Sequence, residues 1–138
     1  METKKDSLLL VFSSLIFMTN VASTFYKKYY IYCLLFFCLT ITSVIVHYHT
    51  NMWTKIIDKF FVLCVVLYGG WVLYNKITPD NIIEVFIIVN TFLLCIYLYY
   101  YGYYVNDYCY HPDKRIGDKY HSLLHVISSL GHHLITFL

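Results

Sequence analysis

Five residues of chemically versatile types lie near the ends of apolar segments: Ser43, His47, Asp58, His121 and His125. Ionisable residues within or beside membrane segments are costly, so they usually face the interior of a helix bundle and serve a function. The serine and the first histidine are four residues apart, and so are the last two histidines. On a helix, each of these pairs shares one face. Two histidines at this spacing can offer two nitrogens to one metal ion.

Together these residues predict a catalytic zinc centre. Three histidines match the protein ligand count of such a site, which leaves one coordination position for water. Bound zinc lowers the pKa of that water toward about 7 and so makes hydroxide available as a nucleophile. We expect Asp58 to hold the water and accept its proton. We expect Ser43 to donate a hydrogen bond to the water or to a developing oxyanion.

Each residue taken alone also has a simpler interpretation. A histidine near a helix end often lies at the membrane interface, bonded to headgroups or water. Asp58 can be paired with Lys55 or Lys59, and Ser43 can bond its own backbone. Histidines on facing helices, such as His47 and His125, can instead be the axial ligands of a haem, although haem would give the aspartate and the serine no role.

Composition indicates the kind of fold that must position these residues. Of the 138 residues, 59% are hydrophobic and 13% are charged, whereas a soluble domain carries about 25% charged residues. A bilayer suits such a chain, and it requires backbone groups to be paired within helices or closed barrels. The apolar runs are continuous rather than alternating, so we predict an all-α, integral membrane bundle that forms a single domain over residues 1–138. About five segments qualify as transmembrane helices: Ser7 to Phe25, Tyr29 to His47, Ile56 to Tyr74, Asn81 to Val105 and Tyr120 to Leu138.

This topology brings the five residues to one side of the membrane. The second segment ends, and the third and fifth begin, on the same face. Seven Lys and Arg residues flank that face and three flank the other, so the positive-inside rule predicts a cytosolic N-terminus. The first segment, with Lys4, Lys5 and the small residues Val21 to Ser23, also resembles a cleavable secretory signal.

Several other classes of protein are disfavoured. The net charge of +2 is small and the basic residues form no stripe, so we expect no nucleic-acid partner. The five cysteines contain no Cys-x-x-Cys pair, so we predict neither a disulfide framework nor a thiolate metal site. His132, about 10 Å further along the last segment than His125, lies too far away to share its ion, and we expect it to pack against a polar neighbour such as Asn20.

The ordered set of motifs resembles the CREST superfamily of membrane hydrolases, which includes the alkaline ceramidases and the progestin and adiponectin receptors. Its pattern is Ser-x-x-x-His in the second helix, Asp early in the third and His-x-x-x-His in the last. In this chain it reads Ser43-Val-Ile-Val-His47, Asp58 and His121-Ser-Leu-Leu-His125. The eleven-residue step from His47 to Asp58 is similar to the ceramidase branch.

The resemblance implies that His47, His121 and His125 bind Zn²⁺ and that Asp58 and Ser43 contact its water. It implies hydrolysis of the amide of a membrane lipid, ceramide or another N-acyl lipid, in an endomembrane of the ER or Golgi type. A receptor-like relative that binds lipid without turnover is the alternative within the superfamily. Members have seven helices, so this chain would be a reduced version of that fold. A homo-oligomer can supply the walls of the lipid pocket that the two missing helices would form. The acidic calcium-binding N-terminal segment of ceramidases has no counterpart, so calcium dependence is not expected.

Overall fold

The first membrane-crossing segment is a helix with a break in its middle. The computed structural model describes residues 4–138, with side chains from Leu8 onward. Helix α1 (Lys4–Ser14) and helix α2 (Phe17–Tyr26) follow each other with only Leu15 and Ile16 between them. The amides of these two residues bond carbonyls three residues back, at 3.1 and 3.2 Å. This tightened turn replaces the regular α-helical pattern and bends the segment without ending it.

The next three segments are long helices joined by short connections. They are α3 (Tyr30–Tyr48), α4 (Met52–Tyr74) and α5 (Ile82–Ile96), and α5 continues through a π-helical turn, η2 (Tyr97–Tyr101), into α6 (Gly102–Val105). A short 3₁₀ turn, η1 (Pro79–Asn81), precedes α5. Helix α4 begins four residues before the predicted segment because Asn51 and Thr54 form a capping box at its start.

The last helix, α7 (Lys114–Phe137), differs from the prediction at its start. We expected a polar loop up to Lys119, but the helix begins at Lys114, where the Asp113 side chain accepts a hydrogen bond from the Arg115 amide. This N-cap satisfies one of the free amides of the first turn. A 3₁₀ turn, η3 (Tyr108–Tyr110), lies just before it.

The described residues form helices and connections with no strand, as the all-α prediction required. Within the part of the chain that the structure describes, four stretches are long and apolar enough to cross a membrane: Leu8–Tyr26, Tyr30–Tyr48, Met52–Tyr74 and Pro79–Val105. These helices identify the chain as a membrane protein by their length and composition. Helix α7 is as long but is not among them, because serines and histidines line it where it packs inside the bundle.

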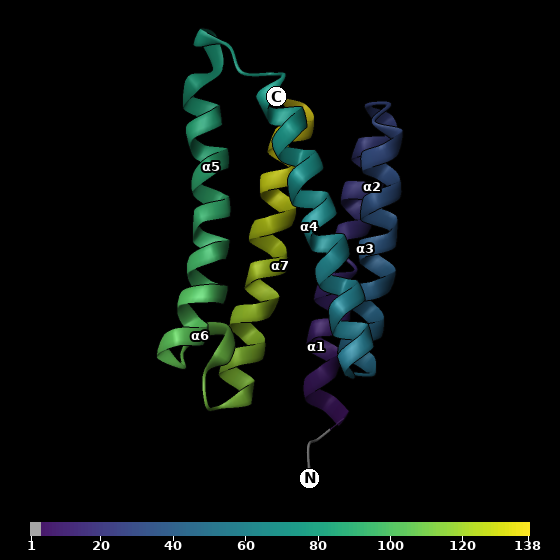
Figure 1. Ribbon diagram of the computed structural model, residues 1–138, viewed down its shortest axis with the longest axis vertical. Coiled ribbons are helices and arrows are strands. Elements are labelled where there is room, and N and C mark those ends of the chain that lie inside the picture. Colours follow the sequence, from purple (N-terminus) through teal and green to yellow (C-terminus); the bar gives the residue numbers. More distant parts are fainter. Residues whose placement is uncertain (1–3) are drawn as a thin grey trace.

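The helices lie nearly parallel, and α7 lies between α5 and the group formed by α1 to α4 (Figure 1). Helix α3 packs on α2 and α4, whereas α7 packs on α1 and α5. The apolar core includes Phe17, Phe36, Val65 and Ile88. At the C-terminal end of α7, the Lys76 ammonium donates hydrogen bonds to the carbonyls of Ile135 and Thr136, at 2.8 and 3.1 Å. A cation at this position satisfies free carbonyls and complements the helix dipole.

Candidate metal centre

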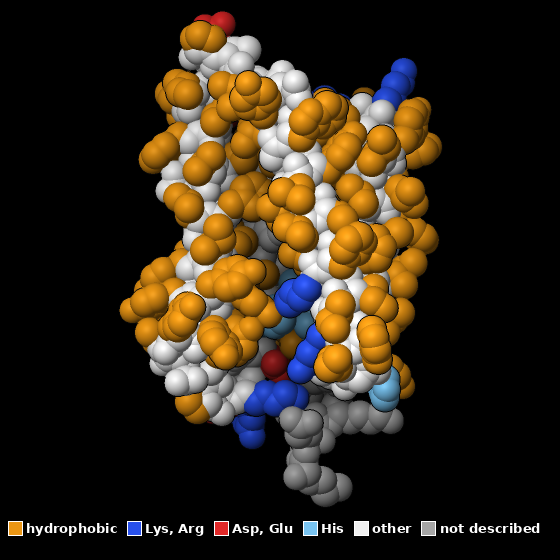
Figure 2. All heavy atoms as spheres, viewed as in Figure 1, with side chains coloured by type: hydrophobic (Ala, Val, Ile, Leu, Met, Phe, Trp, Pro, Cys, Tyr) orange, Lys and Arg blue, Asp and Glu red, His pale blue; other side chains and the backbone are white. Residues whose placement is uncertain are grey.

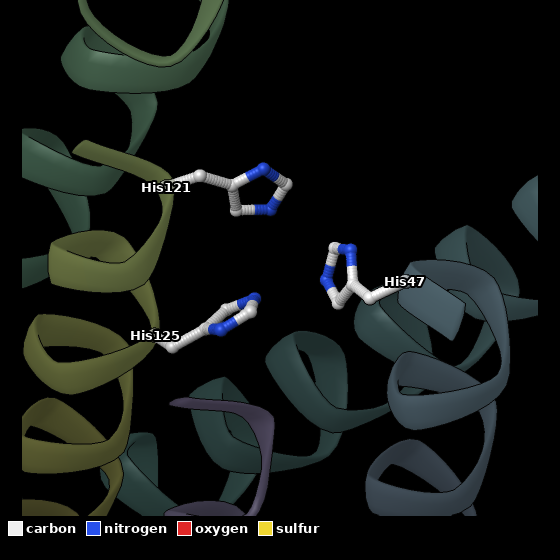
Figure 3. Close-up of side chains that lie close together, drawn as sticks. All are labelled: His47, His121 and His125. Carbon is white, nitrogen blue, oxygen red and sulfur yellow. The ribbon is translucent and has the colours of Figure 1, made fainter. Parts of the chain in front are cut away.

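Three histidines from two helices face one another at the end of the bundle where the chain begins. His47 lies in the last turn of α3, and His121 and His125 lie on one face of α7 (Figure 3). Each offers one ring nitrogen to a group in which all three atoms lie within 4.8 Å of one another. The ring centroids are separated by 4.9 to 5.3 Å. The structure therefore brings these three histidines together at one end of the bundle.

The donor set fits a zinc ion. Zinc binds imidazole nitrogen at about 2.0–2.1 Å in a tetrahedral arrangement, which places ligand nitrogens about 3.3–3.4 Å apart. The histidine nitrogens reach this spacing if each moves by about an ångström, which is within the range of small side-chain rotations. His125 is 4% exposed, and His47 and His121 are half-buried. One side of the group is therefore closed by protein, and the more exposed side leaves room for a further ligand.

A serine that the sequence analysis did not single out orients the innermost histidine. The Ser13 hydroxyl lies 2.8 Å from Nδ1 of His125 and also donates to the Leu10 carbonyl at 3.1 Å. Because a hydroxyl has one proton, the Leu10 bond requires Nδ1 of His125 to be the donor to Ser13. That tautomer leaves the Nε2 lone pair free to bind a metal.

The break between α1 and α2 explains how Ser13 comes to this position. Ser13 and Ser14 both donate to the Leu10 carbonyl, which competes with the regular backbone pattern and bends the helix. The Ser13 hydroxyl then contacts His125 of α7, whereas the Ser14 hydroxyl contacts Ser43 of α3. No motif in the sequence links residues 13 and 125. The pair of serines within an apolar segment was the one feature of the sequence that could have indicated a polar contact there.

Asp58 is buried in the second turn of α4, with 6% of its surface exposed. It is not one of the residues whose ligand atoms form the histidine group. Thr42 of α3 donates to its Oδ1 at 3.4 Å. Among the described residues, no ion pair joins it to Lys55 or Lys59, but Lys59 is near enough to act on Asp58 electrostatically.

Ser43 is also buried, and its hydroxyl is paired with a serine of α1. It lies 3.1 Å from the Ser14 hydroxyl. Because Ser14 donates its own proton to the Leu10 carbonyl, Ser43 is the donor in this pair. The predicted bond from Ser43 to a metal-bound water therefore requires its hydroxyl to rotate away from Ser14.

His132, further along α7, serves packing. His132 is buried among Phe36, Phe92 and Tyr32, and its Nδ1 is hydrogen-bonded to the Tyr32 hydroxyl. The expectation that it packs against a polar neighbour is confirmed, but the neighbour is Tyr32. Asn20 bonds Ser129 instead. His132 lies deeper in the bundle than His125 and is therefore not part of the metal centre.

The cysteines take no part in the histidine group. All five are free thiols, and none belongs to the candidate metal cluster of the described residues. In the connection before α7, burial raises the pKa of the Cys109 thiol to about 11.

The chain matches no known protein-family model, no curated protein and no solved structure. An assignment of function therefore depends on the residues of this chain and their arrangement.

Proposed function

We infer that this membrane protein is a zinc-dependent hydrolase that cleaves the amide bond of a long-chain lipid, such as ceramide. The observation that carries this proposal is the convergence of three histidine nitrogens within 4.8 Å of one another. The buried Asp58 lies on helix α4, which packs on α3. The resemblance to the CREST superfamily supports the same assignment, because its motifs fall on these residues. A neutral His₃ set is the ligand type of a catalytic rather than a structural zinc site.

The residues of the chain have separate roles in this proposal. His47, His121 and His125 hold the ion, which supplies a water of lowered pKa when bound. Asp58 accepts the proton of that water and later delivers it to the leaving amine. Thr42 donates to one carboxylate oxygen of Asp58, at 3.4 Å, which leaves the other oxygen for the proton. Ser43 donates a hydrogen bond toward the oxyanion after leaving Ser14.

The arrangement of the histidines favours an ion over a haem. The axial ligands of a haem lie on opposite sides of a porphyrin plane. Here all three nitrogens lie within 4.8 Å of one another, so a third imidazole stands where the macrocycle would lie. For the orientation in the membrane, we propose that the histidine end faces the cytosol, in line with the excess of Lys and Arg at that end. An endomembrane location is part of the same proposal.

Metal content and lipid turnover of detergent-purified protein test the proposal. We expect zinc near one per chain and release of fatty acid from ceramide or another N-acyl lipid. A His125→Ala variant should lose both, because it removes the most buried ligand. His49→Ala is the matched control, since His49 is exposed and lies two residues beyond His47. A His125→Ala protein that keeps its zinc and its amidase activity would refute the site.

Two other results would redirect the assignment. Zinc near one per chain without turnover of any N-acyl lipid would support a receptor-like lipid-binding protein. A Soret absorption band in place of zinc would support the haem alternative.

A further inference from the structure

The histidine group is open toward the membrane on one side of the bundle. Helix α4 packs on α3, and α5 packs on α7, but α4 and α5 do not form a closely packed pair. Figure 2 shows a hollow between them, with histidine atoms inside it and Lys or Arg side chains at its edge. We call this hollow the α4–α5 opening. A lipid in the bilayer can approach the histidines through it without leaving the membrane.

Lys59 stands at this opening. It follows Asp58 on α4 and is exposed. Its ammonium nitrogen lies 4.4 Å from the centroid of the Tyr99 ring, across the opening on η2. The Tyr99 ring centroid lies 6.1 Å from that of His121. The cation is therefore close enough to interact electrostatically with all three histidines.

This positive charge has no carboxylate partner among the described residues. Its contact there is the face of Tyr99, a cation–π interaction, and Asp58 forms no ion pair with it but lies near enough to interact with it electrostatically. A lysine in a membrane-spanning helix is costly and usually has a functional partner. An exposed ammonium beside this opening can bind an anionic group of a ligand. The acyl chain of a bound lipid can contact apolar side chains further along α4, since Val62 and Val66 lie on the same flank of this helix as Lys59.

We propose that the α4–α5 opening admits N-acyl amino acids, and that Lys59 binds the carboxylate on the amine side of the substrate. This rests on the proposed amidohydrolase function and narrows its substrate class. In an N-acyl α-amino acid the carboxylate is two bonds from the amide nitrogen, so an amide at the histidines brings it close to Lys59. The phosphate of an N-acylphospholipid lies further from its amide. A neutral ceramide offers the ammonium no anionic group.

The reaction is balanced without a further reactant. Water adds to the amide carbon, the carbon–nitrogen bond breaks, and the amine takes up a proton. The products are a fatty acid and a free amino acid.

Binding to an inactive protein tests the substrate class separately from catalysis. The metal-free protein, which is inactive and keeps Asp58, is titrated in nanodiscs with N-oleoylglycine and with neutral N-oleoylethanolamide, which share one acyl chain. We expect the glycine conjugate to bind about tenfold more tightly, and Lys59→Gln to abolish this difference. Lys27→Gln is the matched control, because Lys27 also stacks on an aromatic ring, that of Phe137 at 4.9 Å. It should keep the preference.

The outcomes separate this inference from the proposed function. Equal binding of the two lipids, or a preference that survives Lys59→Gln, overturns the inference even if the wild-type protein hydrolyses both. A Lys59-dependent preference in a protein that hydrolyses no N-acyl lipid supports the binding site and refutes the hydrolase. Tighter binding of N-acylphosphatidylethanolamine than of N-oleoylglycine overturns the choice of carboxylate. Efficient disulfide cross-linking of two Val62→Cys chains would make the opening a subunit interface and also overturn the inference.

Discussion

Replacement of Ser13 by alanine gives a direct test of the metal centre through a residue that need not touch the ion. The hydroxyl of Ser13 lies 2.8 Å from Nδ1 of His125, which is 4% exposed. Water therefore has little access to replace the lost partner. A buried donor left unsatisfied costs about 1–3 kcal/mol, and loss of an outer-shell partner of a metal-bound histidine typically weakens metal binding about 10- to 100-fold. We expect the zinc dissociation constant of Ser13→Ala to rise by about this factor.

The assay is a zinc titration of metal-free protein in detergent, in competition with a chromogenic chelator. Ser23→Ala is the matched control, because Ser23 makes the same bond to a carbonyl three residues back, at 3.1 Å, as Ser13 does. Only Ser13 also contacts a histidine. Ser13→Thr keeps the hydroxyl and should restore most of the affinity. If Ser13→Ala and Ser23→Ala bind zinc equally well, then Ser13 does not orient His125, and the tautomer assigned from its bonds is wrong.

Three further predictions concern single residues. Asp58→Asn should lower amide hydrolysis by about 10²- to 10⁴-fold while zinc stays near one per chain; loss of zinc instead would make Asp58 a ligand. Gly69→Ala should lower the unfolding temperature in detergent, because its Cβ would lie 2.5 Å from the Tyr32 hydroxyl, whereas Gly70→Ala, with nothing within 4 Å, should not. Because the Cys109 pKa is raised to about 11, its alkylation should be slow at pH 7 and accelerate about tenfold per pH unit toward pH 9; a pH-independent rate would contradict this.

The protonation of Cys109 also fixes the sign of that pH dependence. Burial disfavours the thiolate, so the uncharged thiol persists at every pH well below about 11. Only the small thiolate fraction reacts, and this fraction grows as the pH rises.

The sequence by itself determined the helical membrane fold and the convergence of the three histidines. Continuous apolar runs leave backbone groups no partner except within a helix, which predicted the four apolar spans of the structure and, as a fifth segment, the last helix α7. The number of crossings between His47 and His121 then placed both at one end of the bundle. The spacing of His121 and His125 placed them on one face of α7. These features depend on the local periodicity of the sequence and on whether the number of crossings between two residues is even or odd. Neither requires knowledge of how the helices pack.

Only the tertiary structure decided which hydroxyl group forms a hydrogen bond with which partner. The rotation of each helix about its axis, and the bend between α1 and α2, bring Ser13 to His125 across 112 positions of sequence. The same packing directs Ser43 to Ser14 and Thr42 to Asp58. Hydrogen bonds depend on distances of a few tenths of an ångström, whereas apolar patterning specifies a helix face only to within a wide arc. The partners of these residues therefore follow from packing rather than from sequence spacing.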